Sequence, residues 1–271
     1  MGVFQNNLLA GAAAAASAGG AGFYDYQIEQ SCRFDSGSSS TLSKTWGSAA
    51  SDGTKMSWSV WTKKASNGGS LQLISANDTY TGLLFLTNTA SDQLYFQVER
   101  ESNTSSPQAA VTNAQYRDNS GWYHILWTGD ASQSGADQQK IYVNGTRITS
   151  FSTDVLAARA MSSSDTFSIT RNGKQASIGV RSYNNSNYYN GYMAEIICVD
   201  GQAKSPTDFG ETKNGVWIPI DYSGTYGNNG YRLKFENASD LGNDSSGNNN
   251  DFTANNMGAD HQVLDSPTFG S

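Results

Sequence analysis

Short runs of apolar residues, separated by turn-forming residues, recur along most of this chain and constrain what it can fold into. Residues 56–62 alternate apolar or aromatic side chains with serine and threonine, which is the period of a half-buried β-strand. Asn144-Gly145 is the strongest hairpin signal, because both central positions of a type I′ turn need positive φ. Further strands are expected at residues 30–34, 71–75, 83–87, 94–98, 122–127, 140–143, 166–170, 177–180 and 192–200. Almost no helical periodicity occurs outside residues 155–161, so the pattern predicts an all-β antiparallel sandwich.

The charge of the chain limits the kinds of partner that it can bind. Only 15% of the 271 residues are charged, and 17 basic against 24 acidic side chains give a net charge of -7. A nucleic-acid-binding protein needs a basic face to displace counterions, and the sequence contains no cluster of lysine and arginine. No run of about 18 strongly apolar residues occurs either. We therefore expect no nucleic-acid partner and no membrane span.

The N-terminal segment differs from the rest, because Asp25 is the first charged residue of either sign. Its alanines favour a helix, but its glycines oppose one. Two interpretations stay open, a disordered tail and an arm that becomes ordered in an assembly. A secretion signal is disfavoured because no basic residue precedes the apolar stretch. We interpret residues 1–28 as an anchoring arm, with the candidate anchoring residues Phe4, Leu8, Leu9 and Phe23.

Cysteine and histidine are too sparse to indicate a metal or cofactor site. The chain has two of each, and no CxxC motif or Cys/His cluster occurs. Cys32 and Cys198 are expected to be buried free thiols, although a disulfide between them stays open. We expect no cofactor and assign no metal.

Catalytic patterns are also missing. Retaining glycosidases need two carboxyl groups about 5 Å apart, and no Glu-x-Asp-x-x-Glu pattern occurs. Glu99 and Glu101 would share a strand face, but we expect them to be solvated strand-end charges. His124 is expected to be a packed or hydrogen-bonded histidine of the sandwich, and His261 has no partner motif for a Ser/His/Asp site. The sequence therefore predicts a protein that is not an enzyme.

An ordered set of motifs resembles a known family. The set comprises Gln30-Ser31-Cys32-Arg33-Phe34, Met56-Ser57-Trp58-Ser59-Val60-Trp61, Gly121-Trp122-Tyr123-His124-Ile125, Ile141-Tyr142-Val143-Asn144-Gly145 and Tyr189-Asn190-Gly191-Tyr192-Met193-Ala194-Glu195-Ile196. Together these motifs resemble the laminin-G-like, concanavalin A-like jelly-roll sandwich. The resemblance implies a sandwich over residues 29–205 and a C-terminal extension, residues 206–271, packed against it.

The C-terminal extension carries a closer resemblance, to jelly-roll proteins of tailed and other marine bacteriophages. The motifs that carry it are Phe209-Gly210-Glu211, Gly215-Val216-Trp217-Ile218-Pro219, Tyr226-Gly227-Asn228-Asn229-Gly230-Tyr231, Leu233-Lys234-Phe235, Asp244 to Phe252 and Asp265-Ser266-Pro267-Thr268. This resemblance implies a protein of the virion surface, a capsid-decorating spike or fibre, with other virion structural proteins as partners. Purely structural capsid cement and a tail-fibre receptor-binding protein are the alternatives. Whether the chain forms a homo-oligomer stays open.

Residues 244–251 allow two interpretations. Rims of laminin-G-like domains often hold calcium, and Asp and Asn oxygens suit a hard cation. A turn held by side-chain-to-backbone hydrogen bonds is the simpler interpretation, and we favour it.

The loop at residues 183–190 is the most suggestive binding feature. Aromatic rings stack on the C–H faces of sugars, and amides bind their hydroxyls. The loop is rich in both, so we predict a site for host-surface glycans whose candidate residues are Tyr183, Asn185, Asn187, Tyr188 and Tyr189. An ordinary loop whose tyrosines pack on the edge of the sandwich is the alternative.

Overall fold

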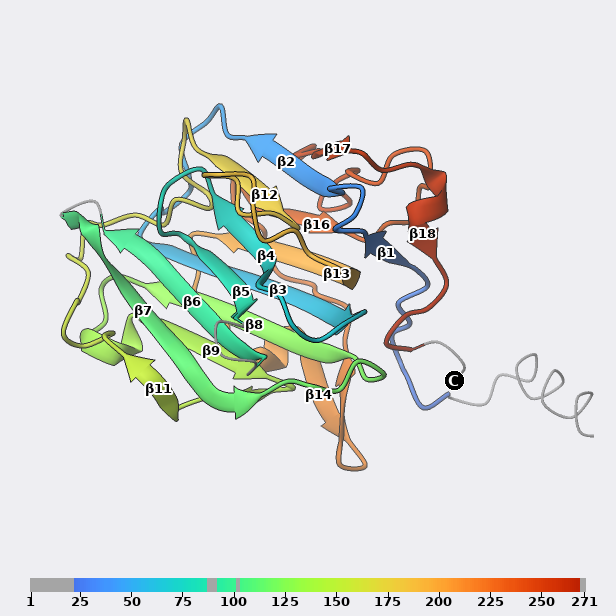
Figure 1. Cartoon of the computed structure of the whole chain (residues 1–271), viewed down its shortest axis with the longest axis horizontal. Helices are drawn as coiled ribbons and strands as arrows, with labels where there is room; N and C mark the ends of the chain where they lie inside the picture. The colour runs from blue at the N-terminus through green and yellow to red at the C-terminus, as the bar shows by residue number, and fades with distance from the viewer. Residues whose placement is uncertain (1–21, 87–91, 101–102, 269–271) are drawn as a thin grey trace, which may run out of the picture.

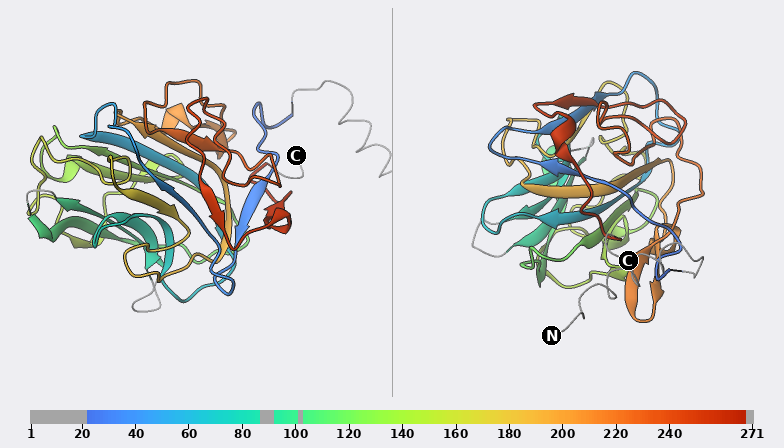
Figure 2. Two further views of the ribbon diagram at one scale, coloured as in Figure 1. Left: turned by 90° about the horizontal axis from the view of Figure 1, so that it is seen from above. Right: turned by 90° about the vertical axis from the view of Figure 1, so that its right-hand side faces the viewer.

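The computed structural model describes residues 22–86, 92–100 and 103–268. Two antiparallel sheets of eight strands each face one another, and a separate two-stranded hairpin lies outside them (Figures 1 and 2). The predicted all-β antiparallel sandwich is confirmed. No helix within these ranges is long and apolar enough to cross a membrane.

In the first sheet, here called sheet A, the strand order is β10-β9-β8-β3-β13-β1-β18, and β16 also pairs with β13. Its strands are β1 (Ser31–Phe34), β3 (Lys55–Lys64), β8 (Tyr123–Asp130), β9 (Gln139–Val143), β10 (Thr146–Arg147), β13 (Gly191–Asp200), β16 (Tyr231–Leu233) and β18 (Gln262–Val263).

In the second sheet, sheet B, the order is β11-β7-β6-β5-β4-β12-β2-β17. Its strands are β2 (Thr41–Thr45), β4 (Leu71–Ala76), β5 (Gly82–Leu86), β6 (Gln93–Arg100), β7 (Asn103–Gln115), β11 (Phe151–Asp154), β12 (Gln175–Ile178) and β17 (Thr253–Asn255). The outer hairpin consists of β14 (Gly210–Lys213) and β15 (Val216–Pro219), and the 3-10 helices are η1 (Gly135–Asp137), η2 (Pro206–Asp208) and η3 (Ala259–His261).

Strand β3 lies at the centre of sheet A, between β13 and β8. Met56, Trp58 and Val60 alternate along it and are fully buried in the core between the sheets. Ser57 and Ser59, on its other face, are buried as well. The strand itself was predicted correctly, but the prediction that it is half-buried is wrong, because other parts of the chain cover the outer face of sheet A.

The cover over the outer face of sheet A consists of two apolar clusters. Phe209 and Tyr222 pack on outward-facing residues of β8 and β13, and Ile28 packs with Trp61 and Ala194. Residues 206–268 also add β16 and β18 to sheet A and β17 to sheet B. The C-terminal segment is thus part of both sheets as well as a cover over one of them.

The described part of the N-terminal segment is attached to the sandwich. The Tyr26 hydroxyl donates a hydrogen bond to Glu195 Oε2 at 3.0 Å and accepts one from Arg232 Nη2 at 2.8 Å. Ile28 is buried; its N–H donates to Thr268 Oγ1 at 2.9 Å, and that hydroxyl donates to the Ile28 carbonyl at 3.1 Å. Packing on the sandwich therefore begins before residue 29, within the predicted arm.

One expected strand is absent, one stretch of helical periodicity forms no helix, and one strand was not predicted. Residues 166–170 form a loop that ends in a turn and not a strand, and their alternation arises because Phe167 and Ile169 insert into the core from this loop. Residues 155–161 form no helix; a single turn, closed by a hydrogen bond from Arg159 N–H to the Val155 carbonyl, explains the pattern. Strand β7 was not predicted, because its sequence NTSSPQAAVTNAQ is short of strand-favouring residues.

The two cysteines are free and buried, as expected. Cys32 lies on β1 and Cys198 on β13, and burial raises the pKa of both thiols. At neutral pH both are therefore protonated and act as small apolar core residues.

Candidate functional site

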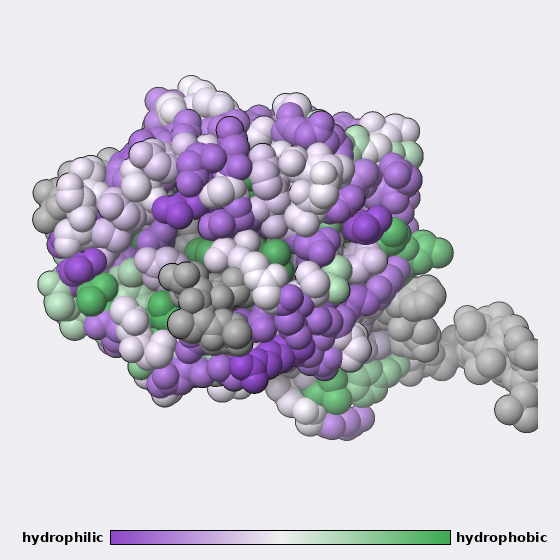
Figure 3. All heavy atoms as spheres, in the orientation of Figure 1, coloured by the Kyte–Doolittle hydropathy of each residue, from purple (hydrophilic) through white to green (hydrophobic). Residues whose placement is uncertain are grey.

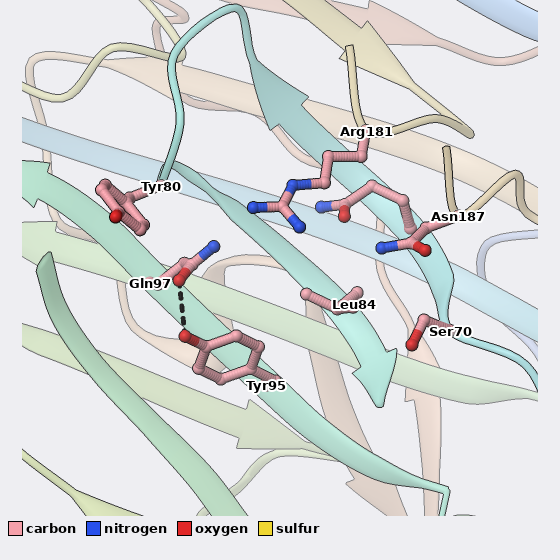
Figure 4. A pocket seen from close by; sticks show the side chains of 8 residues that line it. Ser70, Tyr80, Leu84, Tyr95, Gln97, Arg181 and Asn187 are labelled. Atoms are coloured by element: carbon pink, nitrogen blue, oxygen red, sulfur yellow. Dashed lines mark hydrogen bonds between the residues drawn. The ribbon is translucent and has the colours of Figure 1, made fainter. Parts of the chain in front are cut away.

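A pocket of about 300 Å³ lies on the outer face of sheet B, over β4, β5 and β6 (Figure 4). Successive side chains of a strand point to opposite faces. Leu83 of β5 and Phe96 of β6 point into the core, so the neighbouring Leu84 and Tyr95 point outward. Gln72, Leu84, Tyr95 and Gln97 thus form the pocket floor.

Loops supply the walls. Tyr80 comes from the β4–β5 connection, Ser70 precedes β4, and Arg181 and Asn187 come from the connection between β12 and β13. The Gln72 N–H donates to the carbonyl of Asn187 at 2.8 Å, which holds this loop against β4. Arg181 Nη2 donates to the carbonyl of Thr79 at 2.9 Å. These contacts hold the guanidinium over the floor (Figure 4).

The lining residues contain one cation, Arg181, and no carboxylate. Burial raises the pKa of Tyr95, although Arg181 opposes this effect, so the hydroxyl stays protonated at neutral pH. It donates to Gln97 Oε1 at 2.5 Å. Within the described part of the chain the Tyr80 hydroxyl has no hydrogen-bond partner. The pocket therefore combines a positive charge, two aromatic rings and free polar groups.

Four of the five residues predicted for glycan binding are at least partly accessible. Asn187 lines the pocket, Tyr183 is 55% exposed, Asn185 is exposed and Tyr188 is half-buried, but none of the last three lines it. The prediction that Tyr189 contacts a glycan is wrong, because its side chain is fully buried. Its ring lies edge-on to Phe34 and its hydroxyl is 2.5 Å from Thr62 Oγ1. Of the anchoring residues, Phe23 contacts Tyr24 edge-on, and Phe4, Leu8 and Leu9 lie outside the described residues.

Several pocket residues were missed from the sequence. Tyr95 and Gln97 alternate with the apolar core residues of a predicted strand, so period two could have placed them on the outer face. Arg181 and Tyr80 lie in loops, and no sequence pattern brings those two loops together.

His124 is a buried structural residue, as expected. Trp217 Nε1 can only donate, so Nδ1 of His124 accepts at 3.1 Å, and the proton on Nε2 faces Ser59 Oγ at 2.8 Å. Burial lowers the pKa of His124 to about 3, so the ring is neutral at ordinary pH. Ser59 is 2% exposed, so this Ser-His pair is closed to a substrate.

The described glutamates that the sequence analysis named, Glu99 and Glu195, are partly or fully buried. Glu99 is partly buried rather than solvated, and burial, with Asp78 nearby, raises its pKa; Glu101 lies outside the described residues. Glu195 is buried against Arg232, whose Nε donates to Glu195 Oε1 at 2.5 Å. Arg232 Nη2 also lies 2.8 Å from Asp221 Oδ1. This ion-pair group fastens the chain segments that cover sheet A.

The stretch 244–251 has the hydrogen bonds of a turn. Asp244 Oδ1 accepts from the N–H of Arg232 at 2.8 Å and of Ser246 at 2.9 Å. Its Oδ2 accepts from the Asn250 N–H and the Ser246 hydroxyl, both at 2.8 Å. The favoured interpretation is thus supported. Across residues 22–86, 92–100 and 103–268, no group of three or more His, Cys, Asp or Glu side chains is arranged to hold a metal.

Comparisons with solved structures find similar structures at low sequence identity. A protein from Bacteroides ovatus ATCC 8483, to which carbohydrate binding is ascribed, matches with a TM-score of 0.60 and 14% identity. The match covers 89% of this chain but only 62% of that protein. A heptameric SAP-like pentraxin from Limulus polyphemus gives 0.40 at 12% identity, over 66% of this chain and 80% of that one. The CBM40 module of Ruminococcus gnavus IT-sialidase gives 0.43 at 9%, over 67% and 96%.

The sequence itself matches a family. No curated protein matches it. A laminin G-type family model, described as the concanavalin A-like lectin/glucanases superfamily, matches residues 35–206. That range contains most of both sheets and every residue that lines the pocket on sheet B. Because the match covers more than half of the chain and agrees with the two-sheet architecture, the protein belongs to the concanavalin A-like lectin/glucanases superfamily.

Proposed function

We propose that this protein is a non-enzymatic component of a phage virion surface that attaches to host-surface glycans. The observation that carries the glycan-binding part is the pocket on sheet B, with Arg181 held over a floor of alternating strand residues. The family contains lectins, and carbohydrate binding is ascribed to the Bacteroides ovatus protein of the same fold. Both support a binding role.

The pocket chemistry favours an acidic sugar. A guanidinium group can bind a carboxylate through two parallel hydrogen bonds. No aspartate or glutamate lines the pocket to compete for Arg181. Tyr80 and Tyr95 offer ring faces for the C–H groups of a pyranose. We therefore propose a sugar that carries a carboxylate, such as a sialic or uronic acid.

The virion part of the proposal rests on the sequence. The motifs of the C-terminal extension resemble those of phage jelly-roll proteins, and the first 24 residues are uncharged. In this proposal residues 1–28 anchor the chain among other virion structural proteins. Many copies on one particle would raise the avidity of a weak sugar site by about 10²–10⁴.

Replacement of Arg181 tests the binding site. Arg181→Ala should weaken binding of 3′-sialyllactose or trigalacturonate about 10–100-fold, the worth of charged hydrogen bonds. Arg181→Lys should restore only part of the affinity, because a lysine ammonium lacks the paired donors. Isothermal titration calorimetry gives both values. Arg33→Ala, at an exposed arginine on sheet A, is the matched control. Equal affinity of the Arg181→Ala variant and the natural chain would refute this site.

Labelling of particles tests the virion role. Gold-labelled antibody against the whole chain should decorate purified particles, and deletion of residues 1–21 should abolish the label. That deletion keeps Tyr26 and Ile28, so its thermal unfolding should match that of the full chain. Particles without gold would contradict the virion role, and normal incorporation of the shortened chain would contradict the anchoring arm. Labelled particles whose protein binds no glycan would favour the structural decoration alternative.

A further inference from the structure

A second pocket, of about 460 Å³, is lined by three tryptophans. Trp61 lies on the outer face of β3, Trp122 precedes β8, and Trp217 lies on β15. The tryptophan pocket therefore lies on sheet A, on the opposite side of the sandwich from the pocket on sheet B. Its other lining residues come from the β9–β10 turn and the β14–β15 hairpin: Asn144, Thr146, Thr212, Gly215 and Val216. The hairpin lies outside the range that matches the family, so this pocket is built partly by the C-terminal segment.

The surroundings of Trp217 fix its ring. A Cβ atom at Gly145 would lie 2.4 Å from the ring, and one at Gly210 would lie 2.6 Å from it. Two glycines thus let the indole lie directly against the backbone. On another side the ring stacks on His124 with a centroid distance of 5.9 Å, and its N–H is bonded to that residue.

Trp122 is fixed in a similar way. Its Nε1 donates to Asp265 Oδ1 at 3.3 Å, and Lys63 Nζ lies 5.4 Å from the ring centroid. Both half-buried indoles therefore have their N–H groups satisfied inside the protein. What remains for a ligand is apolar ring surface, held rigidly by the fold.

The polar groups of the pocket are uncharged and largely unpaired. Asn144 Oδ1 accepts from the His124 N–H at 2.8 Å, which leaves its amide nitrogen free among the described residues. The side chains of Thr146 and Thr212 are exposed and have no hydrogen-bond partner in that part of the chain. No charged residue lines the pocket. Figure 3 shows an apolar patch at the lower edge of the molecule, where Figure 1 places the hairpin; Val216 is 49% exposed there.

We infer that the tryptophan pocket binds a neutral pyranose unit of an oligosaccharide. The C–H face of the sugar would lie on the indole surface, and its hydroxyls would bond to the Asn144 amide and the two threonines. The volume is within the range of about 300–1,000 Å³ typical of ligand pockets. A purely apolar ligand would leave these polar groups unpaired, at about 1–3 kcal/mol each. A charged sugar would find no counterion among the lining residues.

This inference does not rest on the proposed acidic-sugar site, because the two pockets share no residue and lie on different sheets. If both hold, one chain carries two sites with different preferences, and a glycan with neutral and acidic units could engage neighbouring copies through different faces.

Neutral tetrasaccharides test the inference on the full chain. We expect at least one of cellotetraose, maltotetraose and β-1,4-galactotetraose to change the tryptophan emission and to give a calorimetric Kd. The double variant Thr146→Ala/Thr212→Ala should weaken that binding at least tenfold, and its exposed positions should leave thermal unfolding unchanged. Thr153→Ala, at an exposed threonine of β11, is the matched control.

The outcomes separate the two sites. Loss of tetrasaccharide binding in the threonine variant, with 3′-sialyllactose binding intact, supports the tryptophan pocket. Tetrasaccharide binding that survives in the threonine variant, or no binding of any of the three neutral probes, would overturn the inference. Arg181→Ala should leave tetrasaccharide binding unchanged, so a loss there would place the neutral sugar in the pocket on sheet B and likewise overturn it.

Discussion

His124 shows how one residue links the cover of sheet A to its central strands. Its ring is fully buried, accepts from Trp217 on the hairpin and faces Ser59 on β3. The bond from Trp217 needs the neutral ring, since a protonated Nδ1 could no longer accept from the indole, whereas Nε2 can donate to Ser59 in either state. His124 therefore has a structural role, and protonation of its ring opposes folding.

Stability should fall in mild acid because of this residue. The folded pKa of about 3 lies below the unfolded value near 6.5, so the unfolded chain takes up the proton between the two. The free energy of unfolding should fall, as pH decreases from 6.5, by up to about 1.4 kcal/mol per unit from His124 alone. Urea unfolding at pH 7, 5.5 and 4.5 measures the slope. His124→Gln should be less stable at pH 7 but show a shallower slope; an unchanged slope would contradict this account.

Side chains of the candidate site were predictable only in part. The loop at residues 183–190 contributes Asn187, but burial of Tyr189 depends on its edge-on contact with Phe34, more than 150 positions away. Arg181 is held at the pocket by a hydrogen bond to the carbonyl of Thr79 in a separate loop. Composition can suggest a candidate binding loop, whereas long-range packing decides which of its side chains are exposed.

At the scale of elements, two Asn-Gly hairpins have the same backbone and different neighbours. Asn144 and Gly145 have φ of 46° and 76°, and Asn214 and Gly215 have 52° and 82°. Only the first turn lies under a tryptophan ring. A Cβ atom at Gly145 would lie 2.4 Å from Trp217, whereas one at Gly215 would meet nothing within 4 Å.

This pair separates backbone strain from packing. Gly215→Ala should cost about 1–2 kcal/mol, the penalty for a Cβ atom at positive φ. Gly145→Ala should cost clearly more, because Trp217 must also move, and it should change the tryptophan emission. Chemical denaturation of both variants gives the difference. Equal losses would mean that the indole adapts without cost and does not pack as described.

The strands were predictable where apolar residues alternate with polar ones, as in β3, β6 and β8, and where turn residues bound them. Strand β7 escaped prediction because alanine and polar residues suffice when neighbouring strands pair on both sides. Residues 166–170 show the converse, since two buried apolar side chains in a loop imitate a strand. Local pattern therefore indicates burial more directly than it indicates backbone conformation.

At the scale of the whole molecule, the two outer faces of the sandwich differ. Sheet B presents its outward side chains at the Arg181 pocket, whereas sheet A is largely covered by the segments around Ile28, Phe209 and Tyr222. The cover meets the sandwich at the Glu195–Arg232 ion pair and leaves the tryptophan pocket beside the hairpin. The family motifs in the sequence are enough to predict the sandwich. The cover could not be predicted in this way, because it lies mostly outside residues 35–206, the range that matches the family.

Two hydrogen bonds between Ile28 and Thr268, here called the clasp, determine where a mechanical load would enter the fold. Both hydrogen bonds of the clasp join the first and last described segments, and Ser31 Oγ donates to the Asp265 carbonyl beside it at 2.5 Å. Tension applied through residues 1–21 would reach Tyr26 and Ile28 before it reached any strand, because the first strand begins at Ser31. The hydrogen bonds of Ile28 with Thr268 and the Tyr26–Glu195–Arg232 contacts would therefore bear the load first. These contacts lie on sheet A and its cover, so the Arg181 pocket on sheet B lies apart from the place where such a load would enter.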